Sequence, residues 1–461
     1  MMMPRHDRIS ELPESLITQI LLHLPTKDSV KTSVLSTRWK NLWLHVPGLD
    51  LNCRDFSFKN QNELEMVRFI DRFLQFNPES RLLKFKVDYS RDQIPQFEDR
   101  IGDAVSRGVQ VLDVKSNTLY QDADDGLVYP CIEFMPLNLY TSKTLLSLKL
   151  LCSGLWEPEG LVYMPCLRFM HLQGLRWRSS SGSGGSTMNL EKLVSGCPVL
   201  EELTYVKDIN DDESVVTRVR SRSLKRFTAP VEYGCYGNLG VVQTFEIDAP
   251  GLEYMSLKED HFDRIVVKNL TSLFMVDLDI KFIVESGRMF DSEDLSKRNE
   301  ICDFLTGISS VRHMTISHQT VKVLGLYSKV GVIPKFNNLS RLHAVFPSSF
   351  IQFLPVFLES LPNLKHLILE IPYVEERTEE FKVINVPQCL VSALEFLEVK
   401  RLFDWGKEEL KTASYFLENS AVLKKLTLRF MGCPQYYSDT DIYEELNNLT
   451  KRSPTCQIII A

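Results

Sequence analysis

The sequence predicts an α/β fold, in which a short all-helical N-terminal segment is followed by an irregular solenoid of parallel strands with helices outside. Three observations predict it. Residues 11–27, ELPESLITQILLHLPTK, carry apolar side chains at helical spacing between two prolines. A short strand-like motif recurs from residue 82 onward. In several copies proline stands two residues before the first leucine, as expected where a helix gives way to a strand.

The composition fits an ordinary globular protein with a large core: of 461 residues, 44% are hydrophobic and 25% charged. The formal net charge of −7 argues against a nucleic-acid partner, since a broad nucleic-acid surface needs clustered basic side chains. No apolar run of about eighteen residues predicts a membrane span, and no apolar segment marks a secretory signal. Ten scattered cysteines without a CxxC pair indicate reduced thiols in a cytoplasmic and/or nuclear protein.

The first segment is predicted to be one amphipathic helix. Its apolar residues fall on one helical face: Leu16, Ile17, Ile20, Leu21 and Leu24. Pro13 suits a first helical position, where the missing N–H costs nothing, and Glu14 places an acid beside the positive end of the helix dipole. Pro25 ends the helix.

A second helix is expected to start near Thr26 or Asp28, either of which can cap it. Its apolar residues again follow helical spacing, until the pattern breaks at VPGLDL: Leu35, Trp39, Leu42, Trp43 and Val46. Two short helices bury too little surface to be stable alone, so they have to pack on a neighbour. They are either an N-terminal cap on the solenoid or a docking module for another protein.

Residues 7–51 resemble an F-box. The resemblance covers two Leu-Pro pairs, an Ile-Leu pair and the stretch SVLSTRWKNLW, at Leu12, Pro13, Ile20, Leu21, Leu24, Pro25, Ser36, Arg38, Trp39 and Leu42. F-boxes bind the Skp-type adaptor of cullin-based ubiquitin ligases, so another chain is expected to cover part of this surface. The implied adaptor-binding residues are Leu12, Pro13, Leu16, Ile20, Leu21, Leu24, Pro25, Val34, Leu35, Trp39 and Leu42. Some of them, the tryptophans first, are expected to pack inward and join the module to the solenoid.

After an entry segment at 52–79, one motif recurs: an apolar residue, two residues, an apolar residue, one residue and a third apolar residue. The copies are LLKFKV (82–87), VQVLDV (109–114), LLSLKL (145–150), LRFMHL (167–172), LEELTY (200–205), LKRFTA (224–229), LEYMSL (252–257), LFMVDL (273–278), VRHMTI (311–316), LSRLHA (339–344), LKHLIL (364–369), LEFLEV (394–399) and LKKLTL (423–428). Residues 80–385 therefore resemble divergent leucine-rich repeats, in which each unit covers its neighbour's apolar face.

The fifth motif residue lies between the last two apolar positions and should project from the other strand face, which is the concave face of a solenoid. Of these residues only Ile368 is apolar. The candidate target-binding residues are Lys149, His171, Thr204, Ser256, Asp277, Thr315, His343, Ile368 and Glu398. Because any half-buried strand alternates in this way, the pattern supports the architecture more than a binding role.

Residues 386–461 resemble the FBD region, which follows F-box and leucine-rich segments in plant proteins. The signature comprises Pro387, the motifs at 394–399 and 423–428, and a helix through YFLENS. YEELNNLTKRSP and TCQIIIA then predict a last helix and a closing strand. A terminal unit has to shield the last repeat's apolar edge, so we interpret this region as a cap rather than a separate binding site.

No catalytic, cofactor or metal site is expected. His313 and His318 are five residues apart, off the i, i+4 spacing that places two ligands on one helical face. The sequence predicts a non-enzymatic substrate-recognition subunit of a Skp-cullin-F-box ubiquitin ligase, with an unknown target protein on the repeats. The alternatives are a leucine-rich interaction scaffold that does not act in ubiquitination and an enzyme hidden in the irregular repeats. Small-molecule sensing is neither favoured nor disfavoured by any residue.

Overall fold

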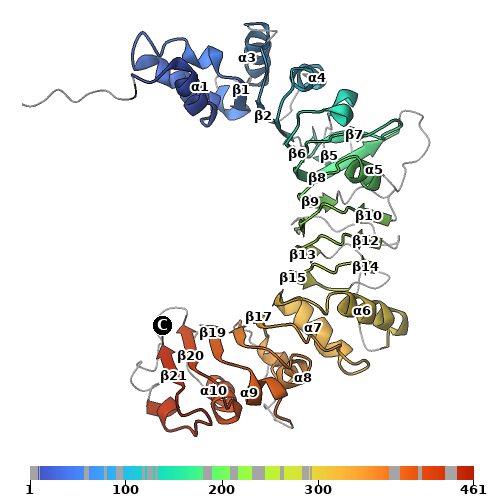
Figure 1. Cartoon of the computed structure of the whole chain (residues 1–461), viewed down its shortest axis with the longest axis vertical. Coiled ribbons are helices and arrows are strands. Elements are labelled where there is room, and N and C mark those ends of the chain that lie inside the picture. Colours follow the sequence, from blue (N-terminus) through green and yellow to red (C-terminus); the bar gives the residue numbers. More distant parts are fainter. Residues whose placement is uncertain are drawn as a thin grey trace, which may run out of the picture. The chain divides into compact units, whose positions relative to one another are not determined.

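The computed structural model describes residue 9, residue 290 and the ranges 11–56, 62–76, 80–89, 97–116, 120–121, 128–129, 133–179, 189–207, 216–230, 244–259, 264–282, 293–372, 385–402, 407–430 and 444–460. The chain divides into two compact units, residues 1–214 and 215–461, which we call unit 1 and unit 2 (Figure 1). Each contains a parallel sheet with helices beside it.

Unit 1 starts with short helices and continues as strands separated by helices. Its helices are α1 (Glu14–Leu22), α2 (Thr26–Lys31), α3 (Asn62–Phe76), α4 (Glu98–Ser106) and α5 (Asn189–Ser195), with 3-10 turns η1 (Thr32–Val34), η2 (Leu42–His45), η3 (Cys53–Phe56) and η4 (Leu137–Thr141). Its main strands are β1 (Gly48–Asn52), β2 (Lys84–Tyr89), β3 (Val111–Ser116), β6 (Ser147–Leu151), β8 (Phe169–Arg178) and β9 (Glu202–Lys207), hydrogen-bonded in that order and all parallel. β7 (Gly154–Trp156) pairs with β8, and β4 (Tyr120–Gln121) pairs with β5 (Val128–Tyr129).

The expected second helix is wrong beyond Lys31. α2 ends there, and the chain continues through η1 and turns before η2. Thr and Ser residues between 32 and 37 have hydroxyls that can hydrogen-bond to backbone groups and so compete with the helical hydrogen bonds. Thr32 Oγ1 donates to the Ser29 carbonyl at 2.7 Å. Thr26 does not cap the helix either, because Pro25 holds the N-cap position and Thr26 Oγ1 accepts from the Asp50 N–H at 2.8 Å.

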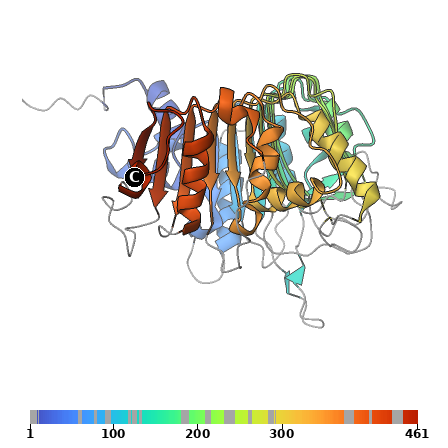
Figure 2. The ribbon, with the colours of Figure 1, turned by 90° about the horizontal axis from the view of Figure 1, so that it is seen from below.

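Unit 2 contains the longer sheet. Its strands are β11 (Arg226–Ala229), β13 (Tyr254–Glu259), β15 (Met275–Ile280), β16 (His313–Ile316), β17 (Arg341–Val345), β18 (His366–Glu370), β19 (Phe396–Leu402), β20 (Lys425–Phe430) and β21 (Gln457–Ile460), parallel and in sequence order. Its helices are α6 (Leu295–Gly307), α7 (His318–Tyr327), α8 (Phe353–Glu359), α9 (Gln388–Ser392) and α10 (Lys407–Asn419), with the 3-10 turn η6 (Ser348–Phe350). The helices lie along one face of this sheet (Figures 1 and 2).

All thirteen motifs form strands, and every strand begins at the third motif residue. The three apolar positions point into the core: in the motif at 364–369, Leu364, Leu367 and Leu369 are at most 1% exposed. Each such side chain contributes on the order of 2 kcal/mol through burial. The predicted α/β repeat architecture is therefore confirmed, and the predicted closing strand is β21, which pairs parallel with β20.

One stretch of unit 2 differs from the expected layer of helices. A second parallel sheet is formed by β10 (Val216–Arg220), β12 (Thr244–Asp248) and β14 (Arg264–Lys268). Phe227 of β11 and Phe245 of β12 are both fully buried and stack with ring centroids 5.2 Å apart, so this small sheet packs on the main one. Alternating apolar residues such as Phe245 and Ile247 favour strands over helices here.

The seven cysteines among the described residues are free. Two of them occupy repeat junctions. Cys197 Sγ in unit 1 donates to the Leu193 carbonyl, and Cys389 Sγ in unit 2 donates to the Leu358 carbonyl. Burial raises the pKa of each of these thiols to about 12.

None of the helices in the described part of the chain has the length and apolar content needed to cross a bilayer.

Candidate functional site

The N-terminal module has a small core of its own. Ile17 and Leu21 of α1 pack with Trp39, Leu42 and Val46, and all five are nearly or fully buried. The hairpin of α1 and α2 is held by hydrogen bonds to backbone carbonyls. Ser29 Oγ donates to Leu21 at 3.0 Å, and the Arg38 guanidinium donates to Leu12.

This core corrects three of the predicted adaptor contacts. Leu21, Trp39 and Leu42 are 1%, 5% and 4% exposed, so they have no surface to offer a second chain. Trp39 packs inward as expected, but within the module itself. The tryptophan that joins the module to the next element is Trp43, whose ring stacks on Phe69 of α3 with centroids 5.8 Å apart.

Six other apolar side chains of the module are exposed, and we call them the N-terminal apolar surface. Its members are Ile9 (58%), Leu16 (44%), Ile20 (47%), Leu24 (37%), Val34 (87%) and Leu35 (65%). The prolines Pro13 and Pro25 are exposed beside them, and Leu12 is half-buried. The sequence reasoning missed Ile9, although its carbonyl accepts from the Leu12 N–H and its position next to the first Leu-Pro pair could have indicated it.

Gly48 lets α1 lie close to the first strands of unit 1. A β-carbon at this position would lie 2.6 Å from Leu22 Cδ1 and 2.9 Å from Lys84 Cβ, closer than real side chains approach. Lys84 Nζ also pairs with Asp50 at 2.7 Å. The module is thus fixed on β1 and β2, and Leu16 and Ile20 stay outside that packing.

The second candidate surface is the face of each main sheet that carries the fifth motif residues, which we call the open face. These residues are direct cross-strand neighbours in both units and form the polar row. In unit 1 it runs Asp50, Lys86, Asp113, Lys149, His171 and Thr204, and in unit 2 it runs Thr228, Ser256, Asp277, Thr315, His343, Ile368, Glu398 and Thr427.

Charges alternate along the polar row of unit 1. Lys86 Nζ lies 4.0 Å from Asp50 and 3.8 Å from Asp113, so each carboxylate faces a cation. Burial raises the pKa of Asp113, while Lys149 and Lys86 oppose that rise. Burial also lowers the pKa of His171, while the hydrogen bond between its Nε2 and the accepting Gln173 Oε1 opposes that change. These groups mostly compensate one another.

The polar row of unit 2 is compensated in a similar way by its neighbours. Asp277 pairs with Lys258 at 3.1 Å, His343 contacts Glu370 at 2.8 Å, and Glu398 pairs with Arg429. Among the predicted target-binding residues Ser256 is buried and donates to Asp277, and Ile368 is only 9% exposed. The other predicted target-binding residues, Thr204 and Thr315 among them, are half-buried.

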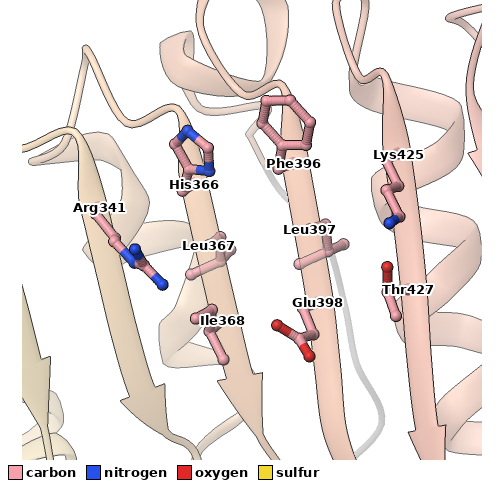
Figure 3. A pocket seen from close by; sticks show the side chains of 9 residues that line it. All are labelled: Arg341, His366, Leu367, Ile368, Phe396, Leu397, Glu398, Lys425 and Thr427. Carbon is pink, nitrogen blue, oxygen red and sulfur yellow. The ribbon is translucent and has the colours of Figure 1, made fainter. Parts of the chain in front are cut away.

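A depression of about 170 Å³ lies on the open face of unit 2, across β17 to β20 (Figure 3). Ile368 and Glu398 of the polar row line it. His366 and Phe396 stack beside them with ring centroids 4.6 Å apart and planes at 10°. The sequence reasoning missed His366 and Phe396, together with Arg341 and Lys425, because it considered only fifth positions. Because side chains alternate along a strand, the third and fifth motif positions lie on the same face, and this two-residue period could have identified all four residues.

Nothing among the described residues resembles a metal centre, since no group of three or more His, Cys, Asp or Glu side chains is placed to hold an ion. His313 and His318 do not converge as a ligand pair: His313 lies in β16, and His318 starts α7.

Two family models match separate parts of the chain. A family model described as "F-box domain" matches residues 9–49, and one described as "FBD" matches residues 382–428. The chain is 74% identical to the F-box/FBD/LRR-repeat protein At1g13780 of Arabidopsis thaliana, over 99% of this chain and 98% of the relative.

Two further Arabidopsis thaliana proteins match over their whole length. Identity to the FBD-associated F-box protein At5g27750 is 63%, over 99% of both chains. Identity to the putative F-box/FBD/LRR-repeat protein At5g44950 is 46%, over 98% of this chain and 99% of the relative. The similarity therefore extends through the repeats and is not confined to the two matched domains.

Proposed function

Because the chain belongs to the F-box/FBD/LRR-repeat proteins, we propose that it is the substrate-recognition subunit of a Skp-cullin-F-box ubiquitin ligase. The F-box would dock the Skp-type adaptor, and through it a cullin, while the repeats hold a target protein. One observation supports the docking most strongly. Six large apolar side chains of the N-terminal apolar surface are exposed even though the module has completed its own core.

Burial of this surface by another chain is energetically favourable. Removing five or six partly exposed aliphatic side chains from water gives on the order of 5–10 kcal/mol before association costs. Lost translational freedom and side-chain ordering take a large part of that gain. The remainder suffices for a stable complex if a few side chains act as hot spots.

The chain's contribution to ubiquitination would be proximity. A target protein held on the open face would be brought near the conjugating enzyme that the cullin recruits, which raises the local concentration of its lysines. The chain would form no covalent bond itself and need no cofactor. We place this role in the cytoplasm and/or the nucleus.

Capture of a purified Skp-type adaptor by the full chain tests the proposal. Leu35→Asp together with Ile20→Asp should abolish capture, because both place a carboxylate on the N-terminal apolar surface. The matched control is Leu161→Asp, which changes a 78% exposed leucine of the same unit outside the module. Its capture should equal that of the unchanged chain.

Failure of the unchanged, folded chain to bind the adaptor would overturn the proposal. It would favour the alternative, a leucine-rich-repeat scaffold that does not act in ubiquitination. Equal capture by the double variant would also contradict it, since the adaptor would then bind elsewhere.

A further inference from the structure

The starts of five neighbouring strands in unit 2 form a cationic edge. The second and third motif residues of β16 to β20 are Arg312 and His313, Ser340 and Arg341, Lys365 and His366, Glu395 and Phe396, and Lys424 and Lys425. Five of these ten carry a permanent positive charge, and only Glu395 carries a negative one. The whole chain has a net charge of −7, so this concentration of cations is local.

The cations nearest the depression are not neutralised by the described part of the chain. Glu395 pairs with Lys424 at 2.6 Å, which leaves Arg341 and Lys425 with no ion pair or side-chain hydrogen bond to any described residue. Both line the depression (Figure 3). The acid on its other side, Glu398, is already paired with Arg429.

The depression between these cations can hold an apolar group. Ile368 and the stacked pair of His366 and Phe396 supply apolar surface. Burial and the neighbouring Arg341 lower the pKa of His366, so its ring is neutral near pH 7. The volume of about 170 Å³ exceeds the ~150 Å³ in which an engineered apolar cavity binds benzene, so one aliphatic or aromatic side chain fits.

We propose that the cationic edge and the depression bind an acidic segment of the target protein. One apolar side chain enters the depression, and flanking carboxylates pair with Arg341 and Lys425. The inference rests on the proposed function and names the chemistry of its target. A protein segment fits better than a nucleic acid because the acid Glu398 and the apolar Ile368 interrupt the cations, whereas a phosphate backbone requires a continuous basic track.

Fluorescence anisotropy with three labelled peptides tests this on the full chain: Glu-Glu-Leu-Glu-Glu, Lys-Lys-Leu-Lys-Lys and Glu-Glu-Ser-Glu-Glu. The first should bind most tightly and weaken as salt rises, because the ion pairs are partly exposed. The lysine peptide should not bind, and the serine peptide should bind more weakly than the leucine peptide. Equal binding of all three, or displacement of the first by single-stranded RNA, would overturn the inference.

Charge reversal locates the site. Arg341→Glu with Lys425→Glu should weaken binding of the first peptide about tenfold or more, as expected when two ion pairs are replaced by two repulsions. Lys329→Glu is the matched control, because this exposed lysine follows α7, away from the strand starts, and its loss should leave affinity unchanged. Unchanged binding by the double variant would contradict the inference.

Adaptor capture by the same preparations separates this inference from the proposed function. A chain that captures the adaptor but prefers no acidic peptide refutes the inference alone. A chain that binds the acidic peptide but never captures the adaptor refutes the proposed function. Capture by the double variant at the unchanged level also shows that it is folded.

Discussion

The N-terminal apolar surface and the polar row differ in how far the chain itself satisfies their side chains, by burial in one case and by ion pairs in the other. The module buries Ile17 and Leu21 but leaves Leu16 and Ile20, one position earlier on the same helix, almost half exposed. The polar row instead compensates its charges across neighbouring strands, as Lys86 does between Asp50 and Asp113. The described part of the chain leaves the apolar side chains of the first surface exposed, whereas it largely pairs the charges of the second.

This difference indicates where each surface can gain binding energy. Apolar side chains gain free energy from burial against any partner of suitable shape. Paired charges gain little from a new partner, because exchanging one ion pair for another is nearly neutral. If the open face binds a target as proposed, we expect its selectivity at groups without an ion pair to any described residue, such as Arg341 and Lys425.

The largest expected effect comes from truncating a side chain on the buried face of α1, compared with one on its exposed face. Leu21→Ala should lower the free energy of unfolding by about 2–5 kcal/mol, because it opens a cavity in the module core. Leu16→Ala should change it by about 0.5 kcal/mol or less, since the side chain is exposed. Urea denaturation measures both, and an equal loss in the two variants would show that Leu16 belongs to the core.

Gly48 tests how tightly the buried side of the N-terminal module packs on β1 and β2. Gly48→Ala should cost about 1–3 kcal/mol, because the new β-carbon forces Leu22 or the strand backbone to move. Gly160→Ala is the control, since a β-carbon there meets no atom within 4 Å. Thermal unfolding of both variants tests this, and a stable Gly48→Ala chain would mean that α1 shifts freely on β1.

Lys86→Met tests whether the polar row of unit 1 depends on its own compensation. The substitution should cost about 0.5–1 kcal/mol at neutral pH and raise the pKa of Asp113 further above its ordinary value. Because a raised folded-state pKa favours the folded chain once the carboxyl is protonated, the cost should shrink as pH falls. Urea titrations at pH 7 and pH 5 check this, with Lys329→Met as control, and a cost that grows on acidification would contradict it.

The smallest effect concerns the histidines at the strand starts. Burial lowers the pKa of His313 and His366, with contributions from Arg341 in both cases. The unfolded chain therefore takes up protons first, and stability falls as pH decreases below about 6.5. His313→Gln with His366→Gln should reduce this fall in a series of thermal unfolding curves from pH 7.5 to 5, and an unchanged pH slope would exclude the two rings as its source.

The sequence predicted the repeat architecture well, because the motif encodes both the strand and its register. The strand starts two residues after the first apolar position in all thirteen copies, so the fifth positions align across the sheet without further information. Leu16, Ile20, Leu24, Val34 and Leu35 were also predicted as exposed adaptor contacts. That role stays a prediction, although the structure leaves all five accessible.

Tertiary packing decided the features that the sequence could not show. Leu35 to Val46 follow helical spacing, yet Trp39 and Leu42 reach the same core from a turn and a 3-10 turn. The small sheet of β10, β12 and β14 replaces helices where local alternation prevailed over the repeat pattern. Arg341 and Lys425 stand out only after cross-strand neighbours reveal which charges have partners.

The buried thiols at the repeat junctions provide a built-in reporter of local opening. With pKa values near 12, Cys197 and Cys389 are protonated at neutral pH and shielded, so alkylating reagents reach them only when the surrounding repeat opens. Cys197 lies in unit 1 and Cys389 in unit 2, at the start of the FBD match. Their labelling rates, followed by mass spectrometry with and without a bound partner, would show which unit that partner rigidifies.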